Sequence, residues 1–207
     1  MSREAPRRPG LCQMSSTAAV SATGPRVEIR LANLWWVAAA LVVMIAAIAS
    51  HDRWVLNFVH VIFGVLWTGI DLFMGFVLGP IMRRLDLPLR RALIIRLMPR
   101  MLFLMPTLSI VTGTSGWFLA VQLGYLDLPW PFIAWIWAAL GITTVLTIQG
   151  VGFLLPTNLR VCFEMQKAEP DLAKLQRWMK RYFLVVATQG ALQVAIIVVM
   201  ARFVTGF

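Results

Sequence analysis

The sequence predicts an all-α membrane protein, a polytopic bundle of about five transmembrane helices. Of its 207 residues, 59% are hydrophobic and only 14% are charged, and the mean hydropathy is +0.78. Such values exclude an ordinary soluble domain. The apolar runs are long and continuous, whereas a membrane β-barrel would have short alternating segments. Because hydrocarbon offers no hydrogen bonds to the backbone, we expect each run to be a helix.

Five apolar runs approach or reach the length of about 20 residues that a membrane-spanning helix needs. They extend from Leu34 to Ser50, Trp54 to Pro80, Met101 to Leu123, Pro131 to Pro156 and Tyr182 to Thr205. We therefore expect residues 31–207 to form one transmembrane helical domain. Residues 1–30 are polar and rich in arginine and small residues, which predicts a disordered basic tail.

The first span has a second interpretation. Ala47-Ile48-Ala49 follows an apolar run and is typical of a signal-cleavage site, and cleavage there would leave four spans. Retention is favoured because the preceding segment is long and the apolar run resembles the other spans. The start of the chain has two alternatives, Met1 and Met14.

The net charge of +10 comes from basic residues that gather in three alternate segments. These are the residues before the first span, the connection between the second and third spans, and the connection between the fourth and fifth. Because Lys and Arg stay in the cytoplasm, this pattern predicts an inside N-terminus and an outside C-terminus. The charge indicates orientation and lipid contact, and nucleic acid is not an expected partner.

The two basic connections differ in their expected structure. Ile81 to Arg100 mixes arginines with apolar residues, which predicts an amphipathic helix broken at Pro88 and Pro99. Glu164 to Arg181 predicts a charged helix with a break at Pro170.

The second span carries two ionisable residues, His60 and Asp71, that hydrocarbon should exclude. On a helix, eleven steps return to nearly the same face, within roughly 20°. The same face also holds Gly64, Trp67 and Met74. We expect a face with this mixture to point into protein and not into lipid.

His60 is the candidate ligand for a cofactor or metal. It lies about 9 Å below the outer boundary of its span, and Met44 and Met200 fall at a similar depth. Imidazole and thioether hold the iron of His/Met haem centres, so haem b is one hypothesis. The alternatives for His60 are a hydrogen bond to a neighbouring helix and proton transfer. Ligation by two histidines of one chain is excluded, because His51 lies about 13 Å away along the helix.

Deeper in the bilayer, Asp71 is expected to share the inner half with polar residues of three other spans. These are Thr112 on the third span, Gln149 on the fourth, and Gln189 and Gln193 on the fifth. A proton relay or a quinone headgroup site would use such groups, and so would a structural network between helices. Both interpretations stay open here, with the structural one slightly favoured.

The chain has no Walker loop, dinucleotide glycine fingerprint, nucleophile elbow or HExxH zinc motif, so soluble-enzyme chemistry is not expected. Copper handling is an alternative, because methionine thioethers select Cu(I).

The segment from Phe58 to Phe73, running on to Gly79-Pro80, contains a His-x6-Trp-x-Gly pattern at His60, Trp67 and Gly69. It resembles the signature helix of a bacterial membrane group, the CopD/HemJ-like proteins, over about 25 residues. The resemblance implies a small helical bundle in a bacterial cytoplasmic (inner) membrane, in which His60 binds haem or metal and the Trp and Gly pack around it. HemJ-type chains carry an additional histidine at the far end of this helix, which this chain lacks.

The sequence therefore favours an integral membrane protein that binds haem b and acts as an electron-transfer or quinone-linked redox subunit. The alternative is a copper-handling or accessory membrane protein that has no enzymatic activity. Expected partners are lipid, quinone and other membrane or redox subunits, and a second copy of the chain is a further alternative.

Overall fold

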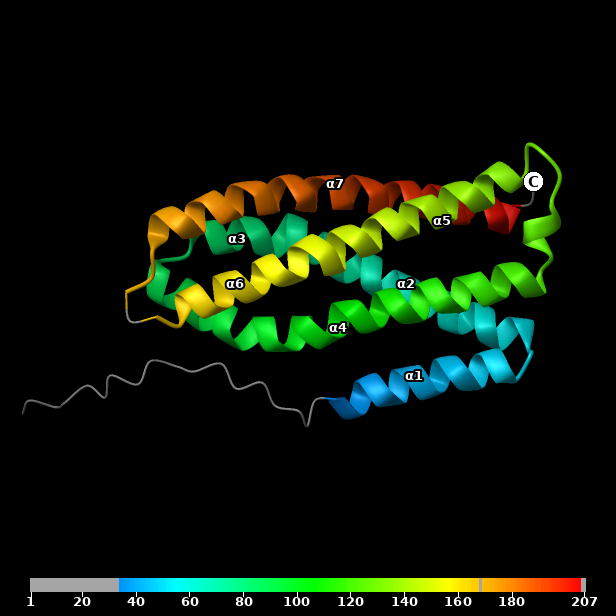
Figure 1. Ribbon diagram of the computed structural model, residues 1–207, viewed down its shortest axis with the longest axis horizontal. Helices are drawn as coiled ribbons and strands as arrows, with labels where there is room; N and C mark the ends of the chain where they lie inside the picture. The colour runs from blue at the N-terminus through cyan, green and yellow to red at the C-terminus, as the bar shows by residue number, and fades with distance from the viewer. Residues whose placement is uncertain (1–33, 168, 206–207) are drawn as a thin grey trace, which may run out of the picture.

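The computed structural model describes residues 34–167 and 169–205, which are almost entirely helical and contain no strand (Figure 1). The segments are α1 (Leu34–Ala49), α2 (Arg53–Leu72), η2 (Phe73–Leu78), α3 (Gly79–Arg84), α4 (Leu87–Gln122), η3 (Tyr125–Asp127), α5 (Ile133–Thr147), η4 (Ile148–Leu154), α6 (Leu155–Met165) and α7 (Leu172–Thr205). The prediction of an all-α bundle is confirmed. The predicted tail, residues 1–30, lies outside the described residues.

Four long helices make up most of the molecule. They are Arg53–Arg84, Leu87–Gln122, Ile133–Met165 and Leu172–Thr205, and they have 32 to 36 residues each. The first joins α2, η2 and α3, and the third joins α5, η4 and α6. At about 1.5 Å per residue each exceeds the hydrocarbon thickness of about 30 Å. All four are long and apolar enough to cross a membrane, so this is a multi-pass membrane protein.

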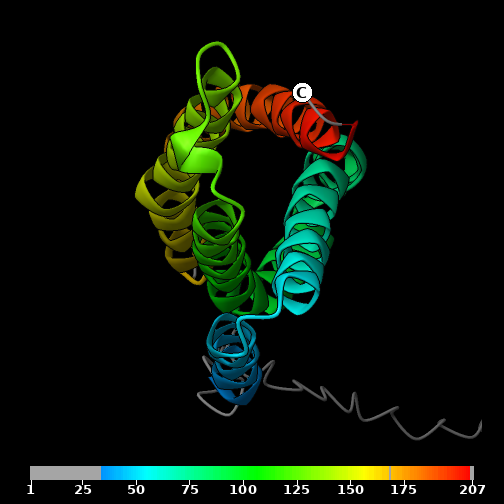
Figure 2. The ribbon, with the colours of Figure 1, turned by 90° about the vertical axis from the view of Figure 1, so that its right-hand side faces the viewer.

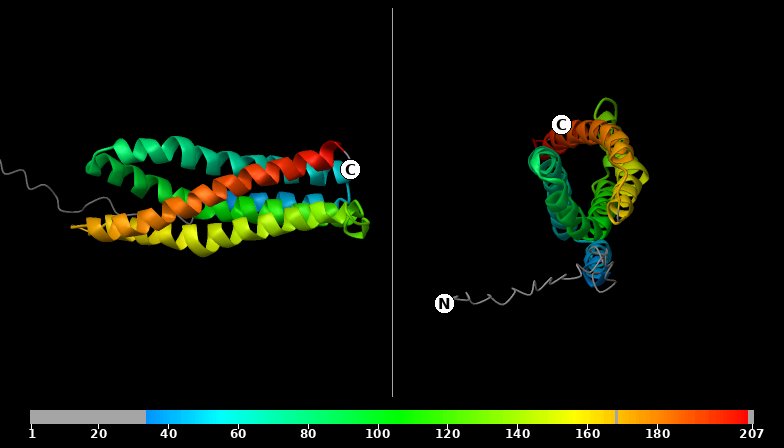
Figure 3. Two further views of the ribbon diagram at one scale, coloured as in Figure 1. Left: turned by 90° about the horizontal axis from the view of Figure 1, so that it is seen from above. Right: turned by 90° about the vertical axis from the view of Figure 1, so that its left-hand side faces the viewer.

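The four long helices form a ring, and α1 lies outside the ring against α2 and α4 (Figures 2 and 3). The contact is a cluster of buried apolar side chains from Ala40, Met44, Ala47, Leu56, Val59 and Val111. With 16 residues, α1 is about 24 Å long. The first of the five predicted spans is therefore present as a helix, but it is shorter than the other four.

One end of the ring carries most of the positive charge, and we call it the basic end. The turn between α3 and α4 and the connection between α6 and α7 both lie there (Figure 1). Residues 81–100 contain Arg83, Arg84, Arg90, Arg91, Arg96 and Arg100 and one acidic residue, Asp86. Glu164, near the end of α6, forms ion pairs with Lys167 at 2.8 Å and Lys174 at 3.7 Å. The second pair connects α6 to the first turn of α7.

Of the two breaks predicted between Ile81 and Arg100, the one near Pro88 is confirmed, since α3 ends at Arg84 and α4 begins at Leu87, and the one at Pro99 is wrong. Pro88 lies in the first turn of α4, where a missing N–H costs no helical hydrogen bond. Pro99 lies inside a helix that continues to Gln122. Ile94 is buried against α6 and α7, and this packing holds the chain helical on the N-terminal side of Pro99. The break predicted near Pro170 is confirmed, since α6 ends at Met165 and α7 begins at Leu172.

Two π-helical segments interrupt the long helices, and each is followed by a proline. Pro80 is the second residue of α3, directly after η2, and Pro156 is the second residue of α6, directly after η4. A proline inside a helix removes one hydrogen bond and clashes with the carbonyl four residues earlier. A wider turn accommodates both effects without ending the helix. Both widened turns contact α7.

The orientation predicted from the charges can be tested with single cysteines. In a chain whose Cys12 and Cys162 are replaced by alanine, Asp127→Cys should react with an impermeant maleimide in intact cells. Asp86→Cys should react only after the cells are permeabilised, because α4 separates the two exposed positions. The reverse pattern would contradict the predicted orientation, and labelling of both from one side would contradict a membrane-crossing α4.

Candidate functional site

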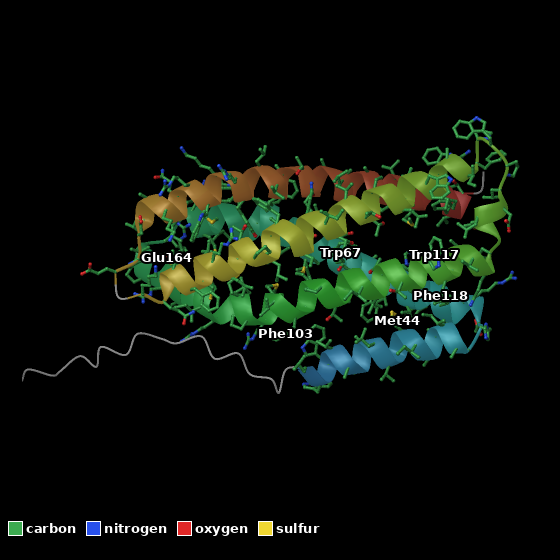
Figure 4. The ribbon with its side chains drawn as sticks, in the orientation of Figure 1. Met44, Trp67, Phe103, Trp117, Phe118 and Glu164 are labelled. Carbon is green, nitrogen blue, oxygen red and sulfur yellow. The ribbon has the colours of Figure 1, made fainter. Side chains whose placement is uncertain are left out.

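The face of α2 that carries His60 and Asp71 points into the protein. Trp67, which lies midway along the bundle (Figure 4), is 6% exposed, and the two ionisable side chains are half-buried. Residues on the opposite face are open to the surroundings, with Val61 50% and Val65 62% exposed. The inward face thus presents two separate polar centres to the neighbouring helices.

The first centre joins Asp71 to two glutamines of α7. The amide Nε2 of Gln189 donates to Oδ2 of Asp71 at 2.6 Å, and Nε2 of Gln193 donates to the same oxygen at 2.9 Å. The Oε1 atom of Gln193 accepts from the hydroxyl of Thr68 at 2.7 Å. Both glutamines are at least 96% buried, and they lie one helical turn apart, which directs both amides at one carboxylate. We call these four residues the Asp71 centre.

The Asp71 centre connects two helices that otherwise make few contacts. α2 packs mainly against α4 and makes few contacts with α7, and the hydrogen bonds of this centre are among them. A hydrogen bond to a charged group contributes about 1.5–3 kcal/mol, and losing one partner leaves a buried polar atom unsatisfied. The centre therefore holds the ring closed between α2 and α7.

One atom of the Asp71 centre has no partner within the described residues. Oε1 of Gln189 is fully buried and accepts no hydrogen bond there. Gln189 also lines a cavity of about 90 Å³, which we call the central cavity. Because a water molecule needs about 10–15 Å³ of such space, the cavity has room for several waters or for part of a small molecule.

The central cavity is apolar except for a few polar groups along its wall. Its apolar lining includes Trp67, Met74, Met98, Met105, Leu146 and Leu154. Its polar lining consists of Asp71, Ser109, Thr147, Asn158, Tyr182 and Gln189. All four long helices contribute, and the π-helical turns η2 and η4 supply part of the wall. An apolar cavity with a few convergent polar groups is the usual form of a small-molecule site.

A second cavity of about 120 Å³ continues toward the basic end, and we call it the basic-end cavity. It shares with the central cavity Asp71, Met74, Met98, Leu154, Asn158, Tyr182 and Gln189. Arg83 of α3 and Arg90 of α4 line only the basic-end cavity. The two cavities thus meet at the Asp71 centre, and one of them reaches the arginines.

The second polar centre surrounds His60 and is formed with α4. Nδ1 of His60 lies 3.0 Å from the carbonyl oxygen of Thr112, so Nδ1 carries the proton and donates it. A Cβ atom at Gly116 would lie 2.6 Å from Cε1 of the same ring. Only glycine therefore permits α4 to approach the imidazole this closely. The hydroxyl of Ser115 is 3.5 Å from Nδ1 but donates to the Val111 carbonyl at 2.6 Å.

The geometry of His60 matches one half of a haem or metal site. A donor bond from Nδ1 to a carbonyl fixes the tautomer and leaves Nε2 free to act as a ligand. The contacts described for His60 are all with α4, however, and they include neither Met44 nor Met200. Met44 packs in the α1 cluster, between α1 and the ring (Figure 4), and Met200 is half-buried on α7.

These residues do not fit a His/Met haem. The His60 ring is oriented as a ligand would be, but neither Met44 nor Met200 is among its described contacts. The described part of the chain also contains no group of three or more His, Cys, Asp or Glu side chains that could hold a metal ion. Haem b and copper both stay predictions from the sequence, and we assign no chemistry through either of them.

The remaining polar candidates lie apart from the Asp71 centre. Gln149 donates from Nε2 to the hydroxyl of Thr188 at 3.3 Å, and its Oε1 has no partner among the residues described. The Thr112 carbonyl accepts a hydrogen bond from His60 Nδ1. The Thr112 hydroxyl is buried and has no partner in the described ranges. The single cluster expected from sequence is therefore divided into three local arrangements.

Two residues that the sequence analysis did not select belong to these centres. Thr68 lies three residues before Asp71, so helical spacing alone places it on nearly the same face. Gly116 has no such signal, because its role depends on how closely α4 approaches α2.

Comparison of the chain with protein-family models, with curated proteins and with solved structures finds no match. The resemblance to CopD/HemJ-like proteins therefore stays a prediction, and the chemistry of the site is inferred from its own residues.

The contact between His60 and Gly116 can be tested by a double-mutant cycle. Gly116→Ala should destabilise the protein by about 1–3 kcal/mol, because its Cβ would overlap the imidazole. Adding His60→Ala should recover much of this loss, and reversible unfolding in mixed micelles would measure both effects. Gly113→Ala is the control, since its Cβ would meet only Thr143 at 3.9 Å. Equal effects of the two glycine substitutions would contradict the close contact.

Proposed function

We propose that this chain is a quinone-binding membrane protein that serves as the membrane subunit of a quinone-linked redox system. The observation that carries the proposal is the buried, unpartnered Oε1 of Gln189 beside the Asp71 carboxylate, in the wall of an apolar cavity. We place the protein in a bacterial cytoplasmic membrane, with other redox subunits as its partners.

A quinol matches the central cavity in polarity. Its ring is flat and apolar, its two hydroxyls are hydrogen-bond donors, and its isoprenoid tail is soluble in lipid. Gln189 Oε1 offers an acceptor that no described residue uses, and the Asp71 carboxylate, which already accepts from two glutamines, has lone pairs for a further donor. Trp67 and Leu146 supply apolar contact for the ring. Binding of a hydroxyl at Gln189 would also satisfy an atom that is costly to leave buried alone.

The position of Asp71 also suits proton transfer. Quinol oxidation releases two electrons to a redox partner and two protons to the protein or solvent. A carboxylate beside the bound hydroxyl can accept one of these protons, and the two glutamine amides keep it in place. Groups of this kind within a membrane mark proton and substrate paths.

A second candidate function is an accessory role without any ligand. It is favoured by the three hydrogen bonds that join α2 to α7 where few other contacts exist. In that case the Asp71 centre only assembles the bundle, and loss of the protein would destabilise a partner.

A binding experiment distinguishes the two functions. We expect detergent-purified protein to bind a short-chain ubiquinol, and Gln189→Leu to weaken this binding about fivefold, since one lost hydrogen bond is worth about 1 kcal/mol. Asp71→Asn should weaken it similarly, because the amide no longer offers a charged acceptor. Gln149→Leu is the matched control, because Gln149 also faces α7 but lines neither cavity.

The thermal stability of each variant is measured together with binding. Equal affinity of all four proteins for ubiquinol would contradict the proposed site. No binding by the wild type, combined with lower melting temperatures for the Asp71 and Gln189 variants, would assign the centre to the accessory role.

A further inference from the structure

The basic-end cavity has a composition that the proposed quinone site does not explain. Its walls are largely apolar and include Met82, Ile94, Leu97, Met179, Val186 and Phe183. Among the described residues, its basic lining consists of Arg83 and Arg90, which come from opposite sides of the turn between α3 and α4. The cavity thus combines an apolar interior with two guanidinium groups at the end of the bundle.

Neither arginine has an acidic partner within residues 34–167 and 169–205. The ion pairs described there join Glu164 to Lys167 and Lys174. The guanidinium carbon of Arg83 lies 4.4 Å from the ring centroid of Phe183, which orients the group and leaves its N–H donors free at the ring edge. Nε of Arg90 is buried and donates no hydrogen bond within these ranges.

Nearby charges do not neutralise the two arginines. Asp86 is the one acidic residue between positions 81 and 100, and it is exposed at the N-terminus of α4. Its side chain makes no capping bond, and its backbone carbonyl accepts from the Arg90 amide at 3.0 Å. Asp71 lies at the opposite end of the same cavity, beside the central cavity. The arginine end is therefore electropositive and offers donors that require an acceptor.

We propose that the basic-end cavity binds the phosphate head group of an anionic amphiphile. Arg83 and Arg90 hold the phosphate, and the hydrocarbon chain lies against Met82, Ile94 and Met179. Planar guanidinium groups bind phosphate through two parallel hydrogen bonds, and basic pockets between membrane helices are typical sites for lipid head groups. A phosphate oxygen accepts the hydrogen bond that Arg90 Nε does not make within the described residues. The apolar wall is the reason for proposing a ligand that has a hydrocarbon chain. The two arginines that hold the phosphate line only the basic-end cavity and are not part of the proposed quinone site.

The test measures lipid binding by native mass spectrometry of the full chain in detergent. The probes are dioleoyl phosphatidylglycerol, and dioleoylglycerol, which has the same chains but no phosphate. We expect the wild type to prefer phosphatidylglycerol, and Arg83→Gln and Arg90→Gln each to raise its Kd about tenfold. Arg96→Gln is the matched control, because Arg96 is an exposed arginine of α4 that lines neither cavity.

Each outcome decides the proposal. Equal binding of the two lipids, or an equal loss in Arg96→Gln, would overturn it, because either result means that no specific phosphate site exists. Inorganic phosphate is also added as a competitor. If it displaces phosphatidylglycerol from the wild type but not from Arg83→Gln or Arg90→Gln, the phosphate site is supported and soluble anions also occupy it. Arg83→Gln and Arg90→Gln should retain ubiquinol binding, because both arginines line only the basic-end cavity, so failure of the quinone proposal and failure of this one give different results.

Discussion

The hydrogen bonds from Gln189 and Gln193 to the Asp71 carboxylate are the contacts on which the arrangement of the ring depends. Hydrocarbon offers a carboxylate no hydrogen-bond donors, so donors from neighbouring helices are needed to stabilise it. Two glutamines one turn apart on α7 meet this need, and they fix both the rotation of α7 and its depth relative to α2. The helices α4, α5 and α6 then complete the ring through ordinary apolar packing, as in the cluster of Trp67, Leu108 and Leu146.

The two prolines explain why this ring contains cavities. Pro80 and Pro156 each follow a π-helical turn, and η2 and η4 lie on either side of the space next to Asp71. A regular α-helix at either position would place its side chains in a different register on the C-terminal side of the turn. The polar centre and the space beside it therefore have separate causes, the first in the Asp71 hydrogen bonds and the second in the prolines.

Periodicity and hydropathy could predict much of this arrangement, but contacts between distant helices could not be predicted. Continuous apolar runs predicted the long helices, and the spacing from His60 to Asp71 predicted the face of α2 that points into the protein. The same reasoning failed at Pro99, because tertiary packing of Ile94 outweighs the local cost of a proline. It also could not choose among the glutamines: Gln149 and Gln189 look alike in sequence, and only the rotation of each helix decides which one meets Asp71.

The two cavities meet at the Asp71 centre, and the electrostatic potential at the basic end is opposite in sign to that at the centre. At the basic end, Arg83 and Arg90 attract an anionic head group. At the centre, the Asp71 carboxylate and the side-chain Oε1 of Gln189 repel such a group and accept hydrogen bonds. An amphiphile in the basic-end cavity therefore has a preferred orientation, with its anionic group at the arginines and its chain toward the residues that line both cavities. A neutral ring with hydroxyl groups is favoured at the centre for the same reason. Because the shared wall includes Met74 and Met98, which have flexible side chains, ligands of different outline can pack against it.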